Sequence, residues 1–286
     1  MRATVHAFFH EPTFTVSYLL SDMATRTAAI IDPVLDFDAK SGRSSRQSAD
    51  VILAAAAERG LQIAWILETH VHADHLSATA YLKAKTGAKT GIGSAVGEVQ
   101  RFFKPVFNAT DLAPDGSQFD KLFADGERFR IGDLEVEVMH TPGHTPACVT
   151  YRVGDAVFVG DTLFMPDYGT ARTDFPGGSA RELYRSIRRI LSLPPETRMF
   201  LCHDYKAPGR DHFAWETTVG EQRAKNLHVH EGIAEEAFVQ MREARDRMLD
   251  MPALILPSIQ VNMRAGQFPP PDSNGTIYLK LPLDRL

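Results

Sequence analysis

The 286-residue sequence is poor in cysteine and holds only Cys148 and Cys202. Two cysteines cannot build the disulfide framework of a small secreted protein, so we expect a reduced, cytoplasmic environment. No run of about 18 apolar residues occurs, and we therefore expect no transmembrane helix and no membrane partner. The first twenty residues lack the uninterrupted apolar core of a signal peptide, because Pro12 and several polar side chains break it. We expect no export.

An excess of basic residues is also missing. The 31 Lys and Arg are outnumbered by 36 Asp and Glu, for a formal net charge of −5. A nucleic-acid-binding protein usually presents a basic face to the phosphate backbone, so we expect no nucleic-acid partner. Apolar residues make up 44% of the chain, which is enough for a full hydrophobic core. The composition leaves the oligomeric state open, with a homodimer among the alternatives.

Short apolar stretches recur along the chain, with helical segments between them. Strands are predicted at residues 14–22, 27–34, 63–70, 134–141, 147–153, 156–161 and 198–204. Helices are predicted from a Ser48 cap to residue 60, over 74–87 with Gly87 as its stop, near 95–103, after the capping box of Ser179 and Glu182, and within the charged segment 214–250. This alternation predicts an α/β fold with two mixed sheets and helices on their outer faces.

The sequence shows no internal repeat and no clear domain boundary. We expect one domain over residues 1–286, with a helical and Pro-rich C-terminal extension from about residue 214 and a Pro-rich tail over 251–286. Residues 36–50 are polar and are expected to form a mobile surface segment. The run 235–248 alternates acidic and basic residues and is expected to be an exposed helix.

The strongest chemical signal is THVHADH at residues 69–75, directly after a predicted strand. It concentrates four ligand-type side chains, and imidazole and carboxylate groups suit a metal such as zinc or iron. In an extended loop, side chains two residues apart point the same way, so His70 and His72 should face one centre. Asp74 and His75 follow where the chain turns. A solvated polar loop is the alternative, and the density of ligand types argues against it.

Three further elements place polar side chains just past apolar strands. In HTPGHTP (140–146) the Pro-Gly turn would expose His144, whereas His140 belongs to the strand or supports a ligand. In VFVGDT (157–162) Asp161 follows a buried strand, and in FLCHDY (200–205) His203 does the same. Alone, Gly-Asp would be read as an ordinary turn. Because ligand clefts in sheet folds form at strand ends, the four elements together predict a metal site.

The motifs THVHADH, TPGHT, GDT and HDY, in this order over residues 69–205, resemble the metallo-β-lactamase superfamily. The resemblance implies an αββα sandwich. Within the superfamily, GTARTDFPGG (169–178) resembles the persulfide dioxygenases rather than the glyoxalase II-like hydrolases, and VNMRAG (261–266) with NGTIYLKLPL (274–283) resembles their longer bacterial branch. A glyoxalase II-like zinc hydrolase of glutathione thioesters is the first alternative. A non-catalytic thiol-binding or sensor protein is the second, disfavoured by the complete ligand set.

The resemblance to persulfide dioxygenases implies one Fe(II) per chain, held by His70, His144 and Asp161. It also implies oxidation of glutathione persulfide by O₂ to sulfite and glutathione. Four residues would then orient the ligands through hydrogen bonds: His72, Asp74, His75 and His203. In the hydrolases the same residues would hold a second metal, so the ligand set alone does not separate one iron from two zinc ions.

Glutathione carries two carboxylates, which calls for cations in the substrate pocket. Arg172 is the first candidate, with a structural ion pair to Asp174 as an equal alternative. Tyr205 is a candidate for a hydroxyl contact to the substrate. Lys206, Arg210 and Arg264 are expected to be solvated surface charges. Alternation along the strand should point Cys202 away from His203 into the core, and Cys148 is expected to be a buried small apolar residue as well.

Overall fold

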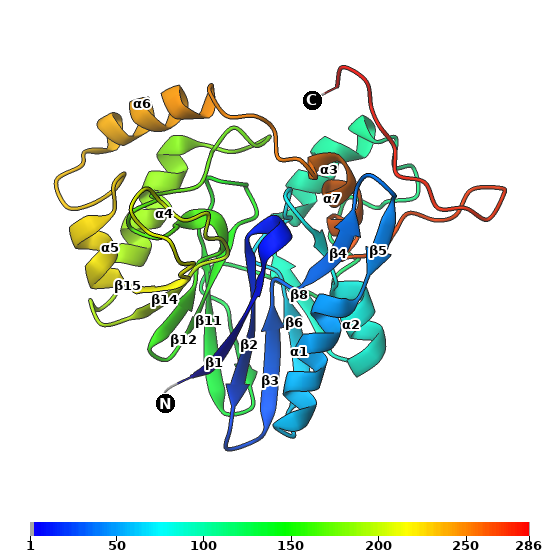
Figure 1. The fold of residues 1–286 in the computed structure, drawn as a ribbon, viewed down its shortest axis with the longest axis horizontal. Coiled ribbons are helices and arrows are strands. Elements are labelled where there is room, and N and C mark those ends of the chain that lie inside the picture. The colour runs from blue at the N-terminus through cyan, green and yellow to red at the C-terminus, as the bar shows by residue number, and fades with distance from the viewer. Residues whose placement is uncertain (1–2, 286) are drawn as a thin grey trace.

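The computed structural model describes residues 3–285 and shows two β-sheets packed face to face with helices outside them. Figure 1 shows α1 (Gln47–Glu58) and α2 (Thr79–Thr86) beside the first sheet, and α4 (Ala180–Leu191) and α5 (Val219–Lys225) on the far side of the second. The predicted αββα architecture is confirmed. The remaining helices are α3 (Val96–Val106), α6 (Glu235–Asp246) and α7 (Ile255–Asn262).

The first sheet has a mixed pairing pattern. Its spatial order is β1 (Thr4–His10), β2 (Thr15–Asp22), β3 (Thr27–Ile31), β6 (Gln62–Leu67), β8 (Lys89–Gly93) and β9 (Lys121–Phe123). The first three strands pair antiparallel, whereas β3, β6, β8 and β9 run parallel. The parallel strands therefore end at one edge, and the loop after β6 carries the THVHADH motif to that edge.

The second sheet follows the chain order β10 (Arg128–Ile131), β11 (Leu134–His140), β12 (Val149–Val153), β13 (Ala156–Phe158), β14 (Arg198–Phe200) and β15 (Glu216–Thr218). Strands β13 and β14 pair parallel, joined through α4, and the other neighbours pair antiparallel. A third, small sheet joins β5 (Arg43–Ser45), β4 (Val34–Asp38) and β7 (Leu76–Ser77).

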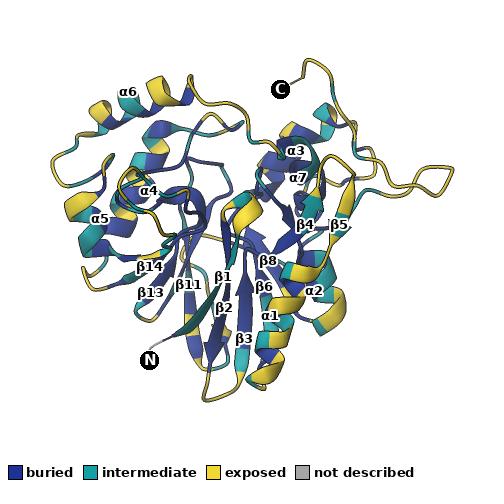
Figure 2. Cartoon of the chain, viewed as in Figure 1, coloured by how far each residue is buried: buried dark blue, intermediate teal, exposed yellow. Residues whose placement is uncertain are grey.

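The core lies between the two sheets, whose strands are coloured largely as buried in Figure 2. Buried apolar residues of both sheets form one cluster there. Tyr18 of β2 packs edge-on against Phe158 and Phe200 of the second sheet. Its hydroxyl donates to the Leu201 carbonyl at 2.5 Å, which satisfies the one polar atom that this ring buries. Separate apolar clusters attach α1 and α2 to the first sheet and α4 and α6 to the second.

Two predicted helix boundaries follow from local hydrogen bonds. Ser179 caps α4 by accepting from the backbone N–H of Glu182, as predicted. Gly87 ends α2 in the left-handed conformation, also as predicted, but that helix begins at Thr79 and not at residue 74. Ser48 does not cap α1, because its hydroxyl donates to Asp36 at 2.6 Å and the helix already begins at Gln47.

Several expectations about the surface were wrong. Residues 36–50 form the β4–β5 hairpin and the start of α1 instead of an irregular segment. The expected exposed helix, α6, buries Phe238 and Arg242, because Arg242 pairs with Asp246 and donates to the Thr170 carbonyl. The expected tail contains α7, whose side chains are largely buried. β1 had not been predicted. None of the helices within residues 3–285 has the length and apolar character required to cross a bilayer.

Candidate metal centre

Four loops at one edge of the sandwich bring seven ligand-type side chains together. They follow β6, β11, β13 and β14, the elements that the sequence singled out. His70, His144 and Asp161 form one group whose ligand atoms all lie within 4.8 Å of one another. The second group meets the same criterion and consists of His72, Asp74, His75 and His203.

The loop over residues 70–75 alternates its side chains between the site and the core. The rings of His70 and His72 face the same side, with centroids 4.0 Å apart, as period-two alternation requires. Val71 and Ala73 point into the apolar cluster that contains α7. The loop is therefore anchored by apolar packing on the side opposite to its ligands.

Tight backbone approaches place His144 and Asp161. Gly143 has φ 136°, and a Cβ there would lie 2.2 Å from the Leu183 backbone nitrogen, so only glycine fits before His144. Gly160 has φ 53°, and its Cβ would lie 2.5 Å from the Thr69 hydroxyl. Asp161 Oδ2 consequently comes within 3.7 Å of His144 Nε2 and 3.9 Å of His70 Nε2.

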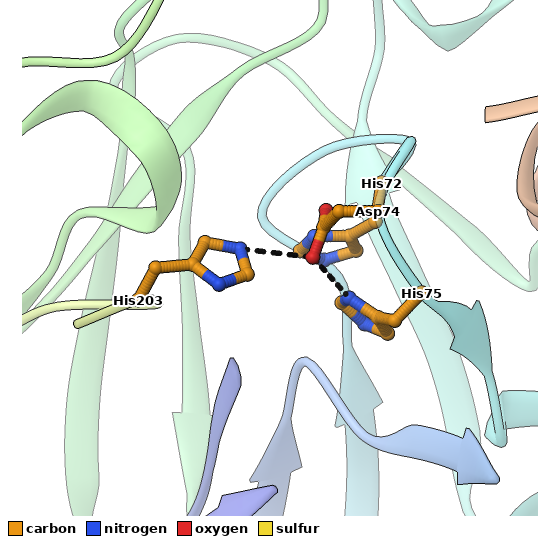
Figure 3. Close-up of side chains that lie close together, drawn as sticks. All are labelled: His72, Asp74, His75 and His203. Atoms are coloured by element: carbon orange, nitrogen blue, oxygen red, sulfur yellow. Dashed lines mark hydrogen bonds and ion pairs between the residues drawn. The ribbon is translucent and has the colours of Figure 1, made fainter. Parts of the chain in front are cut away.

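In the second group, Asp74 lies between two histidines (Figure 3). Its Oδ2 is 3.2 Å from His75 Nδ1 and 3.3 Å from His203 Nε2. Burial opposes ionisation of Asp74, but His203 and His75 outweigh it and hold the pKa of the carboxyl well below its usual range. Asp161 Oδ1 is 3.4 Å from His203 Nε2, so this carboxylate lies between the two groups.

Each of the five histidines has one ring nitrogen that forms no hydrogen bond within residues 3–285. His144 Nδ1 donates to the Arg172 carbonyl at 2.8 Å, and His203 Nδ1 donates to the Phe14 carbonyl at 3.1 Å. A metal-binding histidine typically donates its other N–H in this way. Within residues 3–285, the buried side-chain atoms that form no hydrogen bond include His70 Nε2, His72 Nδ1, His75 Nε2, His203 Nε2 and Asp161 Oδ1. These unsatisfied buried atoms fit a metal centre.

His72 is held by two buried carboxylates that the sequence interpretation missed. Its Nε2 lies 3.0 Å from Asp32 Oδ1 and 3.4 Å from Glu68 Oε2. Burial opposes protonation of His72, but the two carboxylates raise its pKa well above the usual range, whereas burial lowers that of His70 well below it. Without metal, His70 is therefore the neutral imidazole that a metal requires. The sequence contains one indication for each residue: Asp32 (in IIDP) and Glu68 (in ETH) both follow an apolar strand directly.

A cavity of about 380 Å³ opens beside the site. His144, Asp161 and Asp74 line one side of it, and residues of α6 and the following loop line the other. Arg172 and Tyr205, the two candidates for substrate contacts, both line this cavity together with Tyr168 and Arg245. Within residues 3–285, Arg245 forms no hydrogen bond or ion pair that would occupy its guanidinium.

The guanidinium of Arg172 is occupied by protein groups. Its Nε and Nη2 donate to the two carboxylate oxygens of Asp174, each at 2.6 Å, and Nη1 donates to the Asp250 carbonyl. This geometry agrees with the ion-pair alternative for Arg172. The expectation that Arg210 and Arg264 are solvated surface charges was wrong: Arg210 pairs with Asp204 and Asp167, and Arg264 is buried and pairs with Asp111.

Both cysteines are buried, as predicted, and neither forms a disulfide. Burial raises the pKa of the Cys148 thiol to about 12. The predicted direction of Cys202 was wrong, because β14 ends at Phe200 and strand alternation does not extend to residue 203. Its sulfur lies within 4.8 Å of ligand atoms of Asp161 and His203. Burial and the neighbouring carboxylates raise its pKa well above the usual range, which keeps the thiol protonated.

Comparison with known proteins agrees with this arrangement. Residues 10–203 match the family model described as the metallo-beta-lactamase superfamily. A probable metallo-hydrolase of Burkholderia pseudomallei is 54% identical over 99% of this chain and 100% of its own length. Glyoxylase B2 of Dictyostelium discoideum is 48% identical over 100% of this chain and 98% of its own length. Some longer bacterial relatives also match, and the chain spans 65% of their length.

Similarity extends to dioxygenases. The mitochondrial persulfide dioxygenase ETHE1 of Mus musculus is 30% identical over 92% of this chain and 89% of its own length. The crystal structure of ETHE1 from Myxococcus xanthus is similar with a TM-score of 0.73 and 32% identity, covering 92% of this chain and 100% of that one. The similarity thus includes both proteins named as hydrolases and a protein named as a dioxygenase.

Proposed function

Because the chain belongs to the metallo-beta-lactamase superfamily, we propose that it is an Fe(II)-dependent persulfide dioxygenase. The comparisons support an enzyme that is either a dioxygenase or a hydrolase. One Fe(II) per chain is held by His70, His144 and Asp161. The observation that carries the proposal is this compact group of two imidazoles and one carboxylate beside an open cavity. Such a triad with open positions is typical of non-haem Fe(II) oxygenases, and Fe(II) supplies coordination sites for sulfur and O₂.

The proposed reaction converts glutathione persulfide, O₂ and water into glutathione, sulfite and two protons. The S–S bond breaks, its terminal sulfur is oxidised by O₂, and the remaining thiol leaves as glutathione. The cavity of about 380 Å³ beside Asp161 and His144 has room for part of a tripeptide thiol. Its aromatic residues, Tyr168 and Tyr205, would hold the substrate against the site and exclude water from it.

Recognition of a glutathione carboxylate is assigned to Arg245. Three arginines line the cavity: Arg172, Arg242 and Arg245. The charges of Arg172 and Arg242 are already neutralised by Asp174 and Asp246, whereas the Arg245 guanidinium forms no hydrogen bond or ion pair within residues 3–285. An unpaired guanidinium can bind a carboxylate bidentately. Arg172 then acts indirectly, because its carbonyl accepts from His144 and its side chain holds that segment in place. Tyr205 keeps its assignment as a hydroxyl contact to the substrate.

A glyoxalase II-like zinc hydrolase is the second candidate. The group of His72, Asp74, His75 and His203 favours it, because three of its buried nitrogens form no hydrogen bond. These four residues would hold a second metal ion beside the one at His70, His144 and Asp161, and two metal ions would supply the Lewis acid and the activated water for hydrolysis of a thioester. In both proposals the substrate is a glutathione derivative. We place the enzyme in the cytoplasm, in keeping with two buried thiols that form no disulfide.

The deciding experiment uses protein purified without added metal. The dioxygenase proposal predicts close to one Fe per chain and O₂ uptake with glutathione persulfide that yields sulfite. An Asp161→Ala variant should lose both, while Asp167→Asn, which changes an acidic residue paired with Arg210 outside the ligand groups, should retain them. Two Zn per chain with thioester hydrolysis and no O₂ uptake would replace the proposal with the hydrolase.

A further inference from the structure

The last residue of α7, Asn262, contacts the backbone of the loop over residues 70–75, called the ligand loop. Its Nδ2 donates to the carbonyls of His72 and His75 at 2.8 and 2.7 Å. Its Oδ1 accepts from the backbone N–H of Ser77 at 2.7 Å. Asn262 is buried, with 4% of its surface exposed. Its three side-chain hydrogen bonds all go to backbone groups between His72 and Ser77. Asn262 therefore binds the backbone on both sides of Asp74.

The loop has few other polar contacts that could fix its backbone. Within residues 3–285, the backbone N–H and C=O groups of residues 70–75 take part in none of the backbone–backbone hydrogen bonds that lie outside helices and strands. No helix or strand includes this stretch, since β6 ends at Leu67 and β7 begins at Leu76. The ligand positions of a loop without regular structure depend on the side chains that bind its carbonyl groups. Here those contacts come from Asn262.

Apolar packing from the same helix supports this contact. Ile259 and Met263 belong to the apolar cluster that contains Val71 and Ala73 of the loop. Gly266 follows α7 with φ 80°, and a Cβ there would lie 2.8 Å from the carbonyl oxygen of Ser77, so the chain after the helix lies close against β7, which follows the loop. The helix and loop thus form one packed unit.

A second route connects Asn262 with the ring of His72. Ser77, whose N–H donates to Asn262, also hydrogen-bonds through its hydroxyl to Glu68 Oε1. The other oxygen of Glu68 lies 3.4 Å from His72 Nε2. Loss of Asn262 would consequently disturb His72 both at its backbone carbonyl and at the carboxylate that orients its ring.

We propose that Asn262 is a positioning residue that sets the metal-binding geometry of the loop over residues 70–75 from the C-terminal helix. The inference rests on metal binding at the proposed centre but not on which reaction the centre performs. It also lies outside the stretch that matches the family model, residues 10–203.

Binding of Co(II) alone tests the inference, because its affinity and visible absorption spectrum report the site without turnover. Asn262→Leu and Asn262→Asp should bind Co(II) roughly tenfold to a hundredfold more weakly than the wild type in competition with a chelator. Their Co(II) spectra should also change. Asn262→Asp retains an acceptor for Ser77 and the side-chain size, so it serves as the milder variant if Asn262→Leu does not fold.

Gln260→Leu is the matched control. Gln260 is buried on the same helix and hydrogen-bonds to Leu256 and Lys280 but not to the ligand loop. The Gln260→Leu variant should have a lower melting temperature than the wild type but the same Co(II) affinity and absorption spectrum. Folded Asn262 variants with wild-type Co(II) affinity and spectrum would overturn the inference, as would an equal loss of affinity in Gln260→Leu. Wild-type protein that binds no Co(II) would overturn it together with the metal centre, whereas absence of O₂ uptake would not affect it.

Discussion

Nε2 of His72 lies 3.0 Å from Oδ1 of Asp32, and this contact leaves Nδ1 as the nitrogen of His72 that faces the candidate centre. Asp32 also accepts from the N–H and hydroxyl of Thr69, so its position does not depend on His72. A carboxylate behind a histidine fixes the ring orientation and strengthens the imidazole as a ligand. The relationship joins the end of β3 to the loop after β6.

Asp32→Asn should weaken metal binding roughly tenfold to a hundredfold, because the amide is a poorer partner for His72 than the carboxylate. Asp32 has φ 50°, a conformation that asparagine also tolerates, so the backbone should not change. Metal content after dialysis against a chelator measures the effect. Asp36→Asn removes a carboxylate from the neighbouring strand β4 and should retain the metal; equal metal content in the two variants would contradict this role of Asp32.

Replacement of His144 or Asp161 with alanine should abolish metal binding and turnover, since each change removes a proposed ligand. Cys202→Ser should retain the metal and most of the activity, because its thiol is buried and protonated and the hydroxyl fits the same space. Elemental analysis and O₂ uptake on the three variants are the measurements. A folded, metal-loaded Cys202→Ser protein without activity would show that the thiol takes part in the reaction.

Arg172 and Arg245, two of the three arginines that line the cavity, should differ in phenotype. Arg245→Gln should lower kcat/KM by about tenfold to a hundredfold, the loss expected for charge-assisted hydrogen bonds of roughly 1.5–3 kcal/mol. Its melting temperature and metal content at pH 7 should stay close to the wild type, since the Arg245 side chain forms no hydrogen bond or ion pair within residues 3–285. Steady-state kinetics with glutathione persulfide and melting curves test this prediction.

Arg172→Ala and Asp174→Asn should instead share a structural phenotype. Each breaks the bidentate pair and should destabilise the fold by about 1 kcal/mol, with some loss of metal through His144. Thermal unfolding and metal analysis of the two variants provide the measurement. If Arg172→Ala melted like the wild type and lost only substrate affinity, the carboxylate contact would return to Arg172.

Most of the candidate ligands could be predicted from the sequence because each follows an apolar strand directly. His70, His144, Asp161 and His203 needed only local rules, namely strand ends and a Pro-Gly turn. Arg172 shows the limit of such rules: its partner Asp174 is local and was foreseen, but its contact with the Asp250 carbonyl comes from a segment 78 residues away. The sequence therefore does not show whether the guanidinium of an arginine is bound by other protein groups or is available to a substrate.

The C-terminal region was predicted least well. Proline content indicated an irregular tail, yet Ile255–Asn262 forms a buried helix, since tertiary packing against residues 71 and 73 outweighs the local composition. Arg242 was read as part of an exposed charged helix, but it is fully buried because Asp246 neutralises it one turn later. The burial of α7 depends on residues of a distant loop. The burial of Arg242 depends on which face of its helix packs against the protein, and a charged sequence does not indicate that face.

Acid should destabilise the protein through His228. Burial, with help from Arg242 and Arg245, lowers the pKa of His228 from 6.5 to about 4, and its Nδ1 accepts from the Thr170 N–H and lies 3.1 Å from the Thr170 hydroxyl. Between these pH values the unfolded chain binds the proton more readily, so the free energy of unfolding falls as pH decreases through this window. His228→Asn keeps an acceptor without titrating there, and its melting temperature should fall less between pH 7 and 5.

His212→Asn provides the comparison for His228, because it also removes a histidine but from the surface, where the His212 side chain is 73% exposed. Its melting temperature should follow the wild type across the same pH range. A His228→Asn curve parallel to the wild type would mean that other groups cause the acid sensitivity.

The contact between Asn262 and His72 spans 190 residues of sequence. During synthesis, a nascent chain that has emerged as far as Tyr205 already contains every candidate ligand, but the side chain that fixes their loop has not yet been made. Such a chain could bind metal only with a loosely ordered loop. Correct metallation would then follow the completion of translation, and premature termination before α7 would yield chains that compete for metal ions without forming the native centre.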